Sequence, residues 1–245
     1  METTKKTKEM DMLNGGLAGK LILFSIPLAF SSILQQLFNS ADVAVVGRFA
    51  GDRALAAVGS CVALVGIFVN LIVGFSVGPN AVLANLIGQK RRDKINRMLH
   101  TIMAFGLIAG VILMGLGMLS AKPILEVSGT PESVMNEALL YIRIYFIGIP
   151  FMMIYNFGSA VLRSFGDTRR PMYYLILSGT VNVILNLILV IYFKLGVAGV
   201  AIATVISNIL SAGLVLIYLY CREDEFQFRP QRLHIEKEDL KKVLV

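Results

Sequence analysis

One acidic residue, Asp42, lies deep within a long apolar run of this sequence. On insertion scales a carboxylate inside a membrane costs about 2.5–3.5 kcal/mol, and such a residue generally marks an ion or proton pathway. Gln35 and Asn39 precede Asp42 by seven and three residues, so the three share one face of a helix. Two other interpretations stay open: Asp42 caps the following segment, or it pairs with Arg48 near the outer interface. We favour the pathway because polar side chains accompany the carboxylate.

Polar stripes at helical spacing recur in three later apolar runs. They consist of Asn156 with Ser159, of Ser178 with Asn182 and Asn186, and of Thr204 with Asn208 and Ser211. The alternative to a binding role is hydrogen bonding between helices, which is worth about 0.6 kcal/mol on average. For Asn208 and Ser211 we favour that packing role. For Asn182 and Asn186 the pattern alone leaves both interpretations open.

Six apolar runs long enough to cross a membrane must position these side chains, since a spanning helix needs about 20 residues. They are Leu21–Val46, Leu55–Leu86, Met98–Leu119, Val134–Leu162, Met172–Phe193 and Val197–Tyr220. Hydrophobic residues make up 56% of the chain and charged residues only 16%, whereas soluble domains carry about 25% charged residues. The sequence therefore predicts an all-α membrane protein, a bundle of six transmembrane helices. Pro27 lies within the first run and is expected to weaken its helix there.

Basic residues set the expected orientation in the membrane. Of the 23 Lys and Arg residues, 18 lie in the amino-terminal segment, the second and fourth connections and the tail. Four lie in the other connections, and Arg143 lies within a span, where snorkelling or pairing with Glu137 explains it. Because cytoplasmic loops carry the excess of basic residues, we expect both ends of the chain in the cytoplasm. The net charge of +7 then reflects contact with anionic lipid rather than nucleic acid.

No pattern for an enzyme is present. The chain has no phosphate-binding P-loop motif, and its two His residues, His100 and His234, are far apart in sequence. We therefore expect no enzyme activity, no cofactor and no metal site beyond a coupling Na⁺. Six Phe residues in and between the first two runs indicate packing against lipid and core: Phe24, Phe30, Phe38, Phe49, Phe68 and Phe75. The spacing of Gly106 and Gly110 favours close approach of helices.

Several motifs together resemble MATE (multidrug and toxic compound extrusion) transporters. They are Pro27 followed by QQLFNSAD at 35–42 and Gly47, ALAAVG at 54–59, GDTRRP at 166–171, Asn182-x3-Asn186, and LGVAGVAIAT at 195–204. The resemblance implies a two-lobe fold of twelve spans, with a pseudo-two-fold axis along the membrane normal. It also implies an antiporter in the cell membrane that exports organic, often cationic, compounds in exchange for H⁺ or Na⁺.

The resemblance also assigns roles to positions of this sequence. It implies that Asp42, Asn182 and Thr204 form the cation-coupling site, together with Asn186 at a position that is Asp in some branches. It further implies that the substrate cavity is lined by Gln35, Asn156 and Ser159, to which we add Asn39 from its shared face with Gln35. Pro27 matches the proline at which the first helix bends.

The family needs two lobes, and this chain ends at Val245. We expect residues 1–20 to be a cytoplasmic leader, residues 21–220 to be one six-helix lobe, and residues 221–245 to be a cytoplasmic linker toward a missing carboxy-terminal lobe. A truncated transporter is favoured over a self-assembling half-transporter. Two other functions stay open: a flippase for lipid-linked precursors, which should have more cavity Arg, and a membrane scaffold, which needs no aligned polar stripes.

Overall fold

The structure is a computed structural model that describes residues 17–222, 227–229 and 231. Its elements are α1 (Leu17–Phe49), α2 (Asp52–Gly88), α3 (Arg92–Val127), η1 (Glu132–Val134), α4 (Met135–Ile147), α5 (Ile149–Ser164), α6 (Arg169–Leu187), η2 (Ile188–Tyr192) and α7 (Gly196–Tyr220). The predicted all-helical membrane bundle is confirmed. The first sixteen residues of the expected leader, most of the expected linker and His234 lie outside the described residues.

The helices match the six predicted spans, with one difference. Within the described residues, five helices are long and apolar enough to cross a membrane by themselves. The fourth span, predicted as one run from Val134 to Leu162, consists of two helical segments, Glu132–Ile147 and Ile149–Ser164, which meet at an angle of 43°. Pro150 follows the break at Gly148 and lacks the N–H that a continuous helix requires there, which is a recognised cause of kinks.

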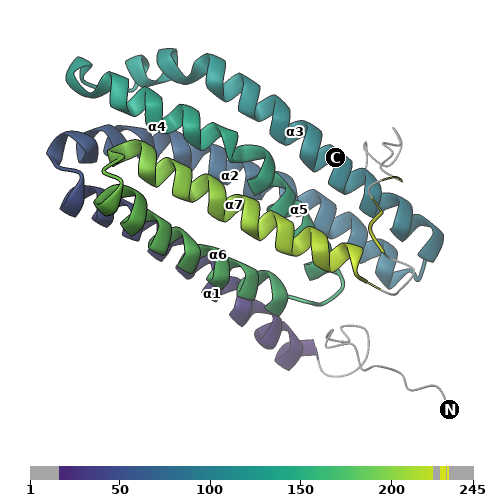
Figure 1. Ribbon diagram of the computed structural model, residues 1–245. Helices are drawn as coiled ribbons and strands as arrows, with labels where there is room; N and C mark the ends of the chain where they lie inside the picture. The colour runs from purple at the N-terminus through teal and green to yellow at the C-terminus, as the bar shows by residue number, and fades with distance from the viewer. Residues whose placement is uncertain (1–16, 223–226, 230, 232–245) are drawn as a thin grey trace.

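The helices form an elongated bundle in which α7 lies in front of α2, between α6 with α1 on one side and α3 with α4 on the other (Figure 1). On the α3 side, contacts are made through glycine. A side-chain carbon added at Gly110 would lie only 2.8 Å from Cα of Pro150, and one added at Gly117 would lie 2.9 Å from the ring of Phe146. Such spacing allows helices to approach closely, as the Gly106 and Gly110 pattern predicted.

Candidate functional site: a polar cluster beside a cavity

Asp42 is the centre of a polar cluster formed by three helices. Its carboxylate is 9% exposed. One oxygen accepts a hydrogen bond from Nδ2 of Asn186 on α6 at 2.5 Å. The other lies 3.4 Å from Oγ1 of Thr204 on α7. The hydroxyl of Thr204 has one proton, and its other acceptor, the carbonyl of Val200, is nearer at 3.0 Å. The link between α1 and α7 is therefore the weaker of the two.

Two asparagines extend the cluster along α6. Nδ2 of Asn186 also donates to Oδ1 of Asn182 at 3.2 Å, and Nδ2 of Asn182 lies 3.4 Å from Oγ1 of Thr204. Oδ1 of Asn186 is buried and accepts no hydrogen bond within the described part of the chain. The cluster therefore combines one carboxylate with several neutral oxygens. Such a set can take up a proton or hold a small hard cation, and it carries only one negative charge.

The four residues assigned to cation coupling therefore lie together. The alternative partner of Asp42, Arg48, is exposed in the last turn of α1. The carboxylate also lies well inside α1, seven residues before its end at Phe49, rather than at a helix start. Its hydrogen bonds run instead to α6 and α7. Among the described residues no group of three or more His, Cys, Asp or Glu side chains could hold a metal ion.

A partly open cavity adjoins the cluster, and its empty space amounts to about 700 Å³ when the solvent at its mouth is included. Its wall includes the expected residues Gln35, Asn39 and Asn156, together with Asp42, Asn182 and Thr204 of the cluster. The polar face predicted for the first helix is thus turned toward one space. Further lining residues are Phe38, Val69, Tyr145, Met152, Tyr155, Leu175, Ser178, Gly179, Ser207, Asn208 and Ser211.

The residues that line the cavity differ from the expected set at several positions. Ser159, expected in the cavity wall, is buried in α5 and is not among the lining residues. Asn208 and Ser211, for which we favoured a packing role, do line the cavity. Tyr145 and Tyr155 were missed because an aromatic residue in an apolar run gives no signal that separates a cavity wall from a core.

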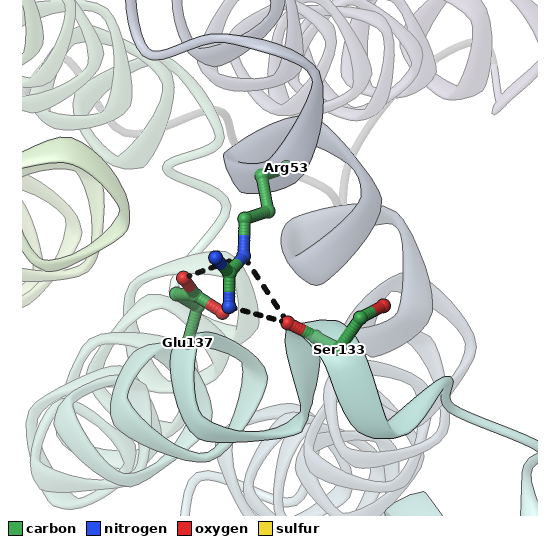
Figure 2. Close-up of polar contacts among 3 residues, drawn as sticks. All are labelled: Arg53, Ser133 and Glu137. Carbon is green, nitrogen blue, oxygen red and sulfur yellow. Dashed lines mark hydrogen bonds and ion pairs between the residues drawn. The ribbon is translucent and has the colours of Figure 1, made fainter.

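A separate ion pair lies at the start of α2, at the end of that helix away from the connection to α3. Nε of Arg53 is 3.2 Å from a carboxylate oxygen of Glu137, and the guanidinium also donates to the backbone carbonyl of Ser133 at 2.6 Å and 3.1 Å (Figure 2). The alternative that Glu137 pairs with Arg143 is therefore wrong. Arg143 is exposed on α4, as snorkelling requires.

Pro27 is buried within α1, which the structure shows as one continuous helix from Leu17 to Phe49. The hydroxyl of Ser31 donates to the carbonyl of Pro27 at 2.7 Å, one turn along the helix. The carbonyl oxygen of Pro27 therefore has a hydrogen-bond donor within α1. A bending role for Pro27 stays a prediction.

Membrane-spanning helices that enclose a polar cavity beside a buried carboxylate define a multi-pass membrane protein of the transporter class. The sequence matches the family described as MatE over residues 27–188. The chain belongs to the MATE family of transporters, which are not enzymes.

Relatives of known name agree with this assignment. The chain is 33% identical over 210 residues to the probable multidrug resistance protein YoeA of Bacillus subtilis (strain 168), covering 84% of this chain and 45% of the relative. It is also 33% identical over 214 residues to the probable multidrug resistance protein YpnP of the same organism, covering 86% and 46%. The chain thus spans about half the length of the curated relatives it matches.

Solved structures show the same fold. A crystal structure of a MATE protein in the bent conformation has a TM-score of 0.89 and 26% identity, covering 98% of this chain and 54% of that one. An outward-facing multidrug resistance MATE family transporter has a TM-score of 0.88 and 25% identity, covering 98% and 53%. One lobe-sized half of these proteins therefore corresponds to the whole of this chain.

Proposed function

We propose that this chain is the amino-terminal lobe of a cation-coupled antiporter that exports drugs and other organic, often cationic, compounds. The observation that carries the proposal is the position of Asp42. It contributes the one carboxylate of the cavity wall and is also hydrogen-bonded to Asn186 and close to Thr204. One residue therefore adjoins both the space for a substrate and a set of oxygens suited to a small cation.

The polarity of the cavity supports organic cations as substrates. Among the described residues, its wall contains Asp42, amides, hydroxyls and aromatic rings, but no Lys or Arg. Aromatic faces and a carboxylate attract cations, whereas the diphosphate of a lipid-linked precursor needs basic partners. This argues against the flippase alternative. The polarity of the binding pocket bears on function in this fold. A transporter from Pyrococcus furiosus has the same fold, and the reverse polarity of its binding pocket suggests a different function for that protein.

For the coupling ion we propose H⁺ rather than Na⁺. Asn186 is an amide where a second carboxylate would double the negative charge, so a bare Na⁺ would be held mainly by neutral oxygens. Burial disfavours a charged carboxylate and polar donors favour it, so protonation and cation binding compete at Asp42. An ion changes the balance between two conformations only by its difference in affinity for them. In this proposal that difference arises when Asp42 exchanges its bonds to α6 and α7.

The proposed arrangement in the membrane has both ends of the chain in the cytoplasm and a second lobe beside this one. Ser128, after α3, and Gln89, after α2, are exposed at connections that should lie on opposite sides. In a variant lacking Cys61 and Cys221, a cysteine at Ser128 should react with an impermeant maleimide from outside intact cells. A cysteine at Gln89 should not react, and the reverse pattern would contradict the orientation.

Binding by the chain itself tests the proposed substrate class. Tetraphenylphosphonium and tetraphenylborate have nearly the same shape and opposite charge. In lipid nanodiscs, with empty nanodiscs as the baseline, the wild type should bind the cation in preference to the anion, and Asp42→Asn should reduce that preference. Equal preference in both proteins would contradict the role of Asp42 in attracting cations. Asp52→Asn, at the exposed start of α2, is the matched control.

A further inference from the structure

Phe38 lies on α1 between Gln35, an expected substrate-cavity residue, and Asp42, an expected cation-coupling residue. It follows Gln35 by three residues and precedes Asp42 by four, so it lies on their face of α1. Its half-buried ring is part of the cavity wall together with both of them. The sequence indicated only packing for this residue. The structure places it where its orientation changes the shape of the cavity.

The ring of Phe38 lies directly on Gly179 of α6. A side-chain carbon added at Gly179 would lie 2.0 Å, 2.3 Å and 2.3 Å from three carbons of that ring, far inside any real contact. Helices α1 and α6, which carry Phe38 and Gly179, pack against each other (Figure 1). The ring therefore has room only because residue 179 lacks a side chain.

Gly179 itself is buried and lines the cavity between Ser178 and the cluster residue Asn182. A helix interior gives no conformational reason for glycine, which is less favourable there than alanine. Its backbone has ordinary helical geometry rather than a positive φ. The close approach of the ring is thus the structural reason for glycine at this position.

We propose that Gly179 is a positioning residue: it seats the ring of Phe38 against α6 and so keeps the cavity open between Gln35 and the Asp42 cluster. This inference rests on the proposed function, in which organic substrates enter that cavity. Any side chain at position 179 displaces the ring. Because α6 closes one side of the ring, the space that can receive it is the cavity, and a bulky substrate loses room.

A double-mutant cycle of Gly179 and Phe38 tests this contact, which we call the seat of the Phe38 ring. We expect Gly179→Ala to weaken binding of tetraphenylphosphonium about tenfold, in the range typical of overpacking. In a Phe38→Ala background, the same change at position 179 should leave the affinity of that background unaltered, because no ring remains to be displaced. Gly213→Ala is the matched control, since an added carbon there meets no atom within 4 Å.

The midpoint of thermal unfolding separates this inference from the proposed function. Gly179→Ala should lower the midpoint in the wild type and not in Phe38→Ala, whether or not any ligand binds. If that coupling is found but the wild type binds no tetraphenylphosphonium, the seat stands and the proposed substrate class fails. If Gly179→Ala weakens binding equally with and without Phe38, or changes neither binding nor unfolding, the seat is wrong.

Discussion

Two helix contacts within this lobe differ in the interactions that stabilise them, although their helices are similarly apolar. One is the contact of α3 with α4 and α5, and the other is the contact of α1 with α6 and α7. Where α3 meets α4 and α5, glycines face Pro150, Phe146 and Phe157, and the atoms nearest to these glycines are carbons. Where α1 meets α6 and α7, the contact includes a carboxylate, two amides and a hydroxyl. The first contact is held by dispersion and depends on shape alone. The second is held by hydrogen bonds that a proton or a cation can replace.

This difference indicates which side of the lobe is built to change. Displacing closely packed helices removes favourable packing contacts and therefore costs free energy. We expect α3, α4 and α5 to keep fixed relative positions, and we call these three helices the frame. The cluster between α1, α6 and α7 contains an acceptor that has no partner among the described residues, Oδ1 of Asn186, and a long contact from Asp42 to Thr204. Such a network has other arrangements of similar energy. We therefore expect function to respond to changes in the cluster and stability to respond to changes in the frame.

The largest expected effect is that of Asp42→Asn on transport. In the proposed two-lobe transporter, this change should reduce ethidium export by cells to the level of a host without the transporter. Expression and membrane insertion should be retained, because Asn has the same shape and removes a charge from the membrane. Export and protein amount are measured in the same cells, with Asp52→Asn as control. Undiminished export would remove Asp42 from the mechanism.

The next largest effect is expected on the frame. Gly110→Ala should lower the free energy of unfolding by about 1–3 kcal/mol, because the new carbon meets the backbone of Pro150, which cannot turn aside. Gly115→Ala, on the same helix, meets no atom within 4 Å and should be nearly neutral. Thermal unfolding in detergent measures both. Equal effects at the two positions would show that the close approach at Gly110 does not limit stability.

A smaller change should sharpen the role of charge in the cluster. Asn186→Asp adds a second carboxylate next to Asp42 and should increase the dependence of transport on Na⁺, since two charges hold a bare cation better than one. The measurement is export at fixed pH with and without Na⁺. Asn182→Asp, one turn away on α6, tests whether the effect belongs to position 186. No gain in Na⁺ dependence at either position would contradict a cation site here.

The smallest effect is expected at the ion pair between Arg53 and Glu137. The Arg53 side chain is 70% exposed, and exposed pairs contribute about 0–1 kcal/mol. A cycle of Arg53→Gln, Glu137→Gln and the double variant should give a coupling energy within that range and leave export unchanged. A loss of export comparable to that of Asp42→Asn would mean that this end of the lobe takes part in the conformational change.

Particular residues show what the sequence predicted and what it could not. The spacing of Gln35, Asn39 and Asp42 was sufficient to predict their common face, because helical periodicity is local. Ser159 shares a face of its helix with Asn156 but is buried and does not line the cavity, so its assignment to the substrate cavity stays a prediction. The proposed pairing of Glu137 with Arg143 was wrong because helical spacing relates only residues that are near in sequence. The partner of Glu137 in the structure, Arg53, lies on another helix and is distant in sequence. Tyr145 needed tertiary contacts to be distinguished from core.

The most direct test of the central claim uses membrane vesicles that contain the proposed two-lobe transporter. Transport of ethidium is measured under an imposed pH gradient without Na⁺, and then under an imposed Na⁺ gradient at uniform pH. The account predicts transport driven by the pH gradient in the wild type and none in Asp42→Asn. Transport driven by Na⁺ at uniform pH would contradict the choice of proton. Transport by Asp42→Asn under the pH gradient would contradict the assignment of coupling to the Asp42 cluster.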